Sequence, residues 1–144
     1  MDSSSWVMFA SIVVLILLSA FFSASETAFS TVNKIRLRNY VDGGSTKAQR
    51  ALEIAEDYDN VLSTILIGNN VVNIASTAIA TILFTNLFGA SGAAISTAVM
   101  TVLVLIFGEI LPKSYAKENS EALALRFAAP LGMLMTVLKP FVWF

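Results

Sequence analysis

The stretch Phe107-Gly-Glu-Ile-Leu-Pro-Lys113 ends the longest uncharged part of this sequence and decides how the chain is interpreted. Between Asp59 and Glu109, 49 residues include no Asp, Glu, Lys or Arg. That length is enough for two membrane spans of about 20 residues each. Glu109 therefore lies in the last turns of a span. A carboxylate is costly there, and it indicates a functional site that faces protein or a water-filled cavity.

Pro112 places a backbone acceptor beside this carboxylate. A proline in a helix has no N–H for the carbonyl four residues earlier, and its ring pushes that carbonyl aside. Four residues before Pro112 is Gly108, which has no side chain to shield the freed oxygen. Two oxygens of this kind suit a hard cation such as Mg²⁺, Ca²⁺ or Na⁺. The alternative is that Pro112 only ends the helix and that Glu109 pairs with Lys113, four residues on.

The composition is that of a membrane protein. Of the 144 residues, 56% are hydrophobic and 13% are charged, and the mean hydropathy is +0.75. The sequence contains no cysteine or histidine, so the usual thiolate, zinc and imidazole chemistry is excluded and an enzyme is not expected. A net charge of −1 without a basic patch argues against nucleic acid as a partner. The first five residues include no Lys or Arg, which favours a retained first span over a cleaved signal.

The first span is expected at about residues 6–32, and it carries one polar stripe. Ser19, Ser23, Glu26 and Ser30 recur at steps of three and four residues, which places them on one face of an otherwise apolar helix. In one interpretation the serines bond back to their own helix and Glu26 lies near the lipid headgroups. An acid inside the stripe favours the other interpretation, in which the stripe is functional.

Residues 34–58 are hydrophilic and are expected to form two short helices that separate at Gly43-Gly44-Ser45. Five of the nine basic residues lie in the segment from Lys34 to Asp59, Lys34 included, and none precedes Trp6. The positive-inside rule therefore predicts a multi-pass protein of the plasma or inner membrane, with residues 34–58 in the cytoplasm and the N-terminus outside.

The second and third spans are expected at about residues 60–84 and 93–116, joined by a short external turn. The second span contains three carboxamides within five residues, those of Asn69, Asn70 and Asn73. Polar side chains in a span can simply hold helices together. Three so close together exceed what such contacts commonly require.

The last apolar segment, about residues 120–144, contains Pro130, Lys139 and Pro140. We expect it to form a helix at the inner membrane interface, with a cytoplasmic C-terminus, and a short fourth span is the alternative. The sequence thus predicts an all-α membrane protein with three transmembrane helices, short cytoplasmic helices and a C-terminal juxtamembrane helix that belts the bundle.

The oxygen-rich positions of the three spans are expected at one depth. With a rise of 1.5 Å per residue, Ser23, Asn69 and Gly108 lie roughly 14 to 17 Å from the charged inner ends of their spans. That is about the middle of a ~30 Å hydrocarbon core. A midplane site at an interrupted helix is a recurring transporter design. Hydroxyl, amide, carbonyl and carboxylate oxygens can together supply the about six ligands that Mg²⁺ takes.

Three motifs carry a resemblance to a known family. Phe22-Ser-Ala-Ser-Glu-Thr-Ala28, Gly68-Asn-Asn-Val-Val-Asn73 and Gly108-Glu-Ile-Leu-Pro-Lys113, in this order, resemble the transmembrane domain of the CorC/CorB and cyclin M (CNNM) magnesium transporters. The resemblance covers essentially the whole chain, and the three motifs are specific together although each alone is weak. It implies three spans, a belting juxtamembrane helix and a π-type distortion where Gly108 and Pro112 stand.

The resemblance also implies an ion site and partners. The site residues carried over are Ser23, Asn69, Gly108 and Glu109, with Ser25, Glu26, Asn70 and Asn73 as second choices. Members of the family are homodimers in the lipid bilayer that export Mg²⁺, with coupling to Na⁺ entry proposed. Full-length relatives continue into cytoplasmic CBS domains that bind ATP, and often into a further C-terminal domain. Neither is expected within these 144 residues.

The leading interpretation is therefore a membrane domain that exports Mg²⁺ by alternating access to a midplane site for a dehydrated ion. The alternative is a non-transporting membrane anchor or scaffold, or a Mg²⁺-sensing dimerisation domain, whose polar groups only hold a dimer together. An intramembrane hydrolase is a third and weaker alternative. Without histidine, a serine nucleophile would need Glu or Lys as its base, and no Ser/Lys pair is expected at midplane depth.

Overall fold

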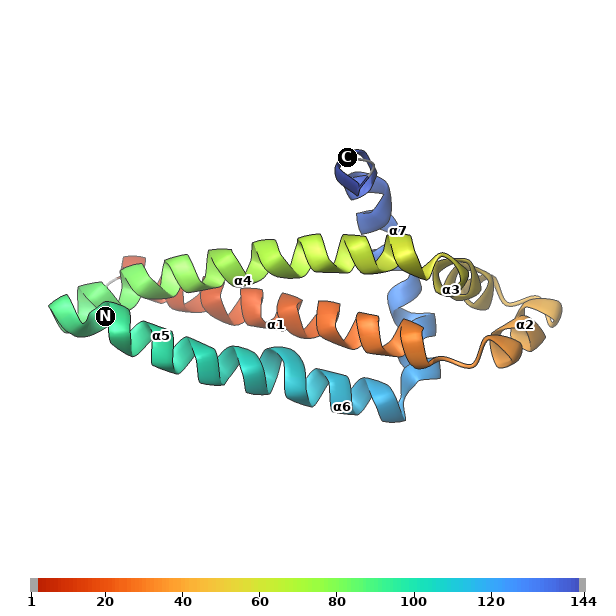
Figure 1. The fold of residues 1–144 in the computed structure, drawn as a ribbon, viewed down its shortest axis with the longest axis horizontal. Helices are drawn as coiled ribbons and strands as arrows, with labels where there is room; N and C mark the ends of the chain where they lie inside the picture. The colour runs from red at the N-terminus through yellow and green to blue at the C-terminus, as the bar shows by residue number, and fades with distance from the viewer. Residues whose placement is uncertain (1–2, 143–144) are drawn as a thin grey trace.

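The computed structural model describes residues 3–142, and almost all of them are helical. Residues 143–144, the end of the expected juxtamembrane helix, lie outside the described part. Three long passes form an elongated bundle (Figure 1): α1 (Ser3–Thr31), α4 (Tyr58–Phe88) and a third pass of α5 (Gly92–Leu103), η2 (Val104–Ile110) and α6 (Leu111–Glu118). The predicted all-α fold is confirmed.

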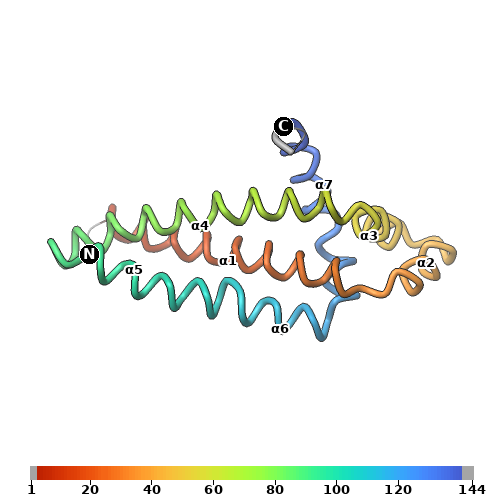
Figure 2. The backbone as a smooth tube through the Cα atoms, viewed as in Figure 1, coloured from red at the N-terminus to blue at the C-terminus, as the bar shows by residue number. Residues whose placement is uncertain are grey.

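The first helix, α1, is the central pass. It lies between α4 and the third pass and packs against both (Figures 1 and 2). Three helical stretches of the described chain are long and apolar enough to cross a membrane: Ser3–Thr31, Tyr58–Glu118 and Ser120–Pro140. The second stretch folds back on itself at Gly89, so it supplies two passes of the bundle.

The outer surface of the bundle is apolar. Leu17 of α1 and Val71 and Ile74 of α4 are each more than 60% exposed. Exposed aliphatic side chains over such a length are expected where a helix faces lipid rather than water. The bundle therefore has the surface of a membrane protein.

The hairpin between α4 and α5 is tighter than the sequence suggests. α4 continues to Phe88, beyond the expected end near residue 84, and a single 3₁₀ turn, η1 (Gly89–Ser91), completes the connection. No residue before Gly89 breaks the helix, and Gly89 itself has a φ of +72°, which glycine adopts without strain. A Cβ added at Gly92 would lie 2.5 Å from the backbone nitrogen of Thr85, so glycine is also required for the close return of the chain.

The hydrophilic segment forms the two expected helices, α2 (Lys34–Asp42) and α3 (Thr46–Glu56). The side chain of Asn33 caps α2 by accepting hydrogen bonds from the first backbone N–H groups. Ser45 caps α3 in the same way, through the N–H of Ala48. Gly44, with a φ of +94°, makes the turn between the helices, so the predicted break is confirmed.

The last helix, α7 (Ser120–Val142), does not join the bundle as a parallel pass. It runs across the end of the bundle that carries α3 (Figures 1 and 2), and it continues through both of its prolines. Its first turn is held to α2 by an ion pair of 3.1 Å between Arg36 Nη1 and Glu121 Oε2. The Tyr40 hydroxyl donates a hydrogen bond to the Glu121 carboxylate. This hydrogen bond and the negative charge of Glu121 raise the pKa of Tyr40 above its usual value. This placement agrees with a juxtamembrane helix rather than a fourth parallel span.

An apolar cluster at this end holds the short helices and α7 against the bundle. Its largest buried side chains come from α1, α2, α4 and α7: Phe29, Leu37, Val61, Ile65 and Leu131. Because α7 contributes to the same cluster as α1 and α4, its position across the bundle is fixed by packing and not only by the ion pair.

Candidate cation site

Ser19 of α1 and Asn69 of α4 meet in the interior of the bundle. The hydroxyl of Ser19 donates a hydrogen bond of 3.0 Å to Oδ1 of Asn69. Ser19 is only 1% exposed, and Asn69 is partly buried. A hydrogen bond between a serine and an asparagine in two membrane passes satisfies polar groups that lipid could not. The contact therefore links α1 and α4 at one defined level.

The third pass reaches the same level through Gly108. A Cβ at Gly108 would lie 3.0 Å from Oγ of Ser19, which is shorter than an ordinary van der Waals contact. Because glycine has no Cβ, the backbone of η2 can approach this hydroxyl closely. α4 approaches α1 in a similar way, because a Cβ at Gly68 would lie 2.5 Å from Cζ of Phe22. Two glycines thus set the spacing of all three passes around Ser19.

The backbone at Gly108 is a wide helical turn. All of η2 is π-helical, and the N–H of Leu111 donates to the carbonyl of Ile106, five residues earlier. The next residue, Pro112, has no N–H to offer the carbonyls of Phe107, five residues before it, or Gly108, four before it. The π-type distortion that the resemblance implied is confirmed. Such turns are frequent at functional sites.

Glu109 follows Gly108 in this wide turn and is partly buried. Neither of the two salt bridges found within residues 3–142 includes Glu109 or Lys113, so the local pair considered from the sequence is not formed. The same part of the chain holds no group of three or more His, Cys, Asp or Glu side chains that could bind a metal ion. A cation at this level would therefore not meet a cluster of carboxylates within residues 3–142.

The other candidate residues of α1 follow Ser19 in the sequence and therefore lie closer to the end of α1 that leads into α2. Ser23 follows Ser19 by one turn on the same face and is buried. Ser25 is fully buried, and its Oγ has no hydrogen-bond partner. Glu26 is partly buried, and its backbone carbonyl accepts a long hydrogen bond of 3.5 Å from the hydroxyl of Tyr58.

The two remaining asparagines do not join the contact at Ser19. Asn70 is exposed. Asn73 lines a separate cavity of about 300 Å³ between α4 and the third pass, together with Thr77, Thr97 and Thr101. The Oδ1 atom of Asn73 is buried without a hydrogen-bond partner. The three carboxamides of α4 therefore lie in at least two different environments.

The sequence prediction names Ser23, one turn further along the same polar stripe, whereas the serine that contacts Asn69 in the structure is Ser19. The predicted depth of Ser23 is measured from Lys34, the first charged residue after the span, but Lys34 belongs to α2 and not to the end of α1. Counted from the helix ends, Ser19 lies 12 residues before Thr31 and Asn69 lies 11 residues after Tyr58. Asn33, a residue type that commonly caps helices, is the sequence signal that α1 ends before Lys34, and it would have shifted the predicted depth of the serines on α1.

Comparisons with known proteins agree with this architecture. Residues 10–144 match the family described as the cyclin M transmembrane N-terminal domain. The chain is 40% identical over 126 residues to the UPF0053 inner membrane protein YfjD of Escherichia coli, which covers 88% of this chain and 29% of the relative. It is 39% identical over 136 residues to a UPF0053 protein of Haemophilus influenzae, covering 94% of this chain and 32% of the relative.

A third relative has a name that states an activity. The polyamine export protein of Salmonella typhimurium is 31% identical over 142 residues, covering 90% of this chain and 32% of the relative. The chain thus spans about a third of the length of each of these three relatives. Since the family match extends over nearly all of a chain with several apolar passes, this multi-pass membrane protein belongs to the cyclin M transmembrane N-terminal domain family.

Proposed function

We propose that the chain is the membrane domain of a Mg²⁺ transporter that binds the ion where Ser19, Asn69 and Gly108 meet. The observation that carries this proposal is the convergence of a hydroxyl, a carboxamide and the backbone of a wide turn from three different passes. Interrupted helices with polar neighbours near the middle of the membrane are a recurring way to bind transported cations.

The spacing of the oxygens suits Mg²⁺. An octahedral ion with ligands at roughly 2.1 Å separates adjacent ligands by roughly 3.0 Å. Oγ of Ser19 and Oδ1 of Asn69 are 3.0 Å apart. They need little rearrangement to become neighbouring ligands, provided that the hydroxyl proton turns away from the carboxamide. Glu109, in the same wide turn as Gly108, supplies the negative charge that a dehydrated divalent ion requires.

The wide turn also offers a way to move the ion. A π-turn and a regular α-turn differ by one residue in their hydrogen-bond register, so a shift between them rotates the carbonyls around Gly108. We propose that such a shift opens the site alternately to the two sides of the membrane, with Na⁺ entry driving Mg²⁺ export. Ser23 completes the ligand set, and Ser25, Glu26, Asn70 and Asn73 are the second choices as ligands.

Polyamine export is the second candidate, favoured by the name of the Salmonella typhimurium relative and of a second Escherichia coli relative, which is also named polyamine export protein. A polyamine carries several ammonium groups and is best held by several carboxylates. Along the passes, between their charged ends, the chain offers only Glu26 and Glu109. A site with few carboxylates and closely spaced neutral oxygens favours a small, hard cation, so Mg²⁺ is the first choice.

Assembly and orientation belong to the same proposal. The chain would act as a homodimer in the plasma or inner membrane, with its N-terminus outside and α2 and α3 in the cytoplasm. In a longer protein, CBS domains would follow α7 on the cytoplasmic side. α2 and α3 contain five basic residues, whereas the hairpin at Gly89 contains no charged residue, and this difference supports the orientation.

Melting of the purified protein in detergent tests the proposal. We expect Mg²⁺ at millimolar concentration to raise the melting temperature and to protect the chain from protease, because an ion that binds only the folded state stabilises it. Spermidine and Na⁺ are titrated in parallel. A response to spermidine with none to Mg²⁺ would favour polyamine export, and a protein that responds to neither would be a membrane anchor.

A further inference from the structure

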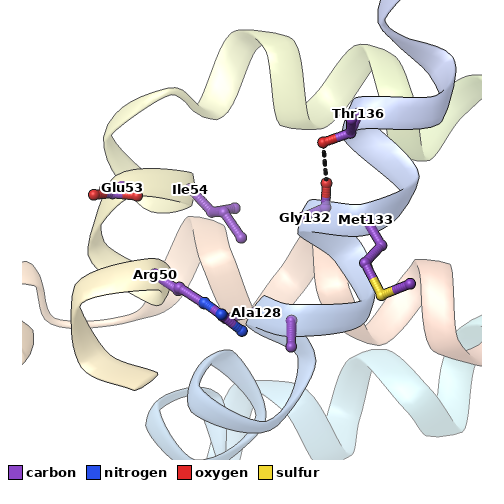
Figure 3. A pocket seen from close by; sticks show the side chains of 8 residues that line it. Arg50, Glu53, Ile54, Ala128, Gly132, Met133 and Thr136 are labelled. Carbon is purple, nitrogen blue, oxygen red and sulfur yellow. Dashed lines mark hydrogen bonds between the residues drawn. The ribbon is translucent and has the colours of Figure 1, made fainter. Parts of the chain in front are cut away.

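A cleft lies between α3 and α7 at the end of the bundle. One part of it, about 420 Å³ in volume, is lined by Arg50 and Ile54 of α3 and by Gly132 and Met133 of α7 (Figure 3). The adjoining part, about 350 Å³, is lined by Lys47, Arg50 and Arg126 and shares Ala128 and Ala129 with the first. We call the two parts together the α3–α7 cleft. It lies at the end of the bundle that carries α3, and none of its lining residues belongs to the contact at Ser19.

The cations of the α3–α7 cleft are available for a ligand. Lys47, Arg50 and Arg126 are exposed, and the two salt bridges within residues 3–142 are made by other arginines. One carboxylate, that of Glu53, also lines the cleft. In Figure 3 Arg50 extends towards Ala128 of α7, whereas Glu53 lies on the side of α3 away from α7. The lining of the cleft therefore contains three cations and one carboxylate, and its net positive charge attracts an anion.

The surface that continues from the cleft along α7 is apolar. Met133 is 71% exposed and Val137 is 68% exposed, one helical turn apart. α7 lies across the end of a bundle whose passes are long enough to cross a membrane. We therefore expect its apolar side at the boundary between headgroups and hydrocarbon, with the cations of the cleft beside it. A ligand that matches both features has an anionic head and an apolar tail.

We propose that the α3–α7 cleft binds an anionic phospholipid, with the phosphate on Lys47, Arg50 and Arg126 and the acyl chains along Met133 and Val137. Arginine side chains bind phosphate through two parallel hydrogen bonds, and basic pockets between membrane helices on the cytoplasmic side are typical sites for anionic headgroups. The bound lipid would fix α7 against α3. This inference is independent of which cation the bundle transports.

Titration of the detergent-purified chain with dioctanoyl phosphatidylglycerol, followed by native mass spectrometry, tests the proposal. We expect one phosphatidylglycerol to be retained per chain, and dioctanoyl phosphatidylcholine not to be retained. Arg126→Ala and Lys47→Ala should each weaken the affinity about fivefold, since each cation near an anionic lipid contributes about that factor. Lys117→Ala, which removes an exposed cation of α6 outside the cleft, is the matched control and should leave the affinity unchanged.

A second variant tests the cleft itself without changing any charge. A Cβ at Gly132 would meet only Cδ1 of Ile54, at 3.9 Å, and Gly132 lines the cleft, so we expect the longer side chain of Gly132→Leu to extend into the cleft and fill it. We expect it to lose phosphatidylglycerol binding and to keep its helical circular dichroism. Equal retention of phosphatidylcholine, or wild-type affinity in the two charge variants or in Gly132→Leu, would overturn the proposal. It would also be overturned if inorganic phosphate displaced the lipid at equal concentration, because the site would then be one for a soluble anion.

Discussion

The hydroxyl of Ser19 and the carboxamide oxygen of Asn69 are 3.0 Å apart, although 50 residues separate them in the chain. Gly108 packs on the same hydroxyl, so one serine touches both of the other passes. A polar contact of this kind in a membrane bundle can be a structural link or part of a site for an ion. The two roles differ in what they predict for Mg²⁺ binding, and substitutions at these positions separate them.

Asn69→Ala and Ser19→Ala should each weaken Mg²⁺ binding about tenfold, which corresponds to ~1.4 kcal/mol, because each removes one oxygen ligand. Loss of the hydrogen bond itself should lower the free energy of unfolding by only about 1 kcal/mol. Isothermal titration calorimetry measures the affinity. Thr81→Ala is the matched control, because its hydroxyl bonds to the carbonyl of Thr77 on its own helix. Unchanged affinity in both variants would show that the contact is only structural.

Gly68→Ala should destabilise the bundle by about 1–3 kcal/mol, as overpacking does in other cores. The added Cβ would lie 2.5 Å from Cζ of Phe22, whose ring is buried and in edge contact with Phe21. Gly132→Ala is the matched control. It has room for the methyl group and should gain up to about 1 kcal/mol from helix propensity. Equal melting temperatures of the two variants would contradict the close approach of α1 and α4.

Pro112→Ala tests whether the proline keeps carbonyls free for an ion. The variant restores an N–H donor, so the wide turn can close into a regular helix. The protein should be no less stable, since Pro112 lies in the first turn of α6 and alanine has the higher helix propensity. Mg²⁺ affinity should nevertheless fall, because the carbonyl of Phe107 or Gly108 gains a partner. If Mg²⁺ titration of this variant matches the wild type, Pro112 has a purely structural role.

The orientation in the membrane can be tested by cysteine labelling, because the chain has no native cysteine. Gly44 and Gly89 have positive φ angles and should not be replaced, so the probes belong on their exposed neighbours. Ala90→Cys should react with an impermeant thiol reagent added to intact cells. Thr46→Cys should react only after permeabilisation. The reverse pattern would place α2 and α3 outside and reject the orientation drawn from the basic residues.

The sequence predicted those parts of the molecule that depend on local pattern. Apolar runs located the passes, and Asn33, Gly44 and Ser45 carry the capping and turn chemistry that separates α2 from α3. The position of Pro112 pointed to a distorted helix, and η2 is that distortion. These features are determined within a few residues of the chain.

The parts that sequence reasoning missed depend on how the helices sit against one another. Ser19 meets Asn69 because α1 ends before Lys34 and because Gly68 and Gly108 let the passes come close. The α3–α7 cleft exists because α7 crosses the bundle, which fixes Arg126 beside Lys47. No short stretch of sequence predicts the contact at Ser19 or the α3–α7 cleft. Each depends on the relative position and direction of two helices that are distant in the chain.

The most direct test of the transport proposal is Mg²⁺ flux through the purified chain in liposomes, with Mg²⁺ and Na⁺ gradients imposed separately. We expect the wild-type chain to move Mg²⁺ and to move it faster against an opposing Na⁺ gradient, Asn69→Ala to lose most of the flux, and Thr81→Ala to keep it. Spermidine should not be transported. A wild-type chain that moves no Mg²⁺ under either gradient, or an Asn69→Ala chain that moves it as fast as the wild type, would contradict the account.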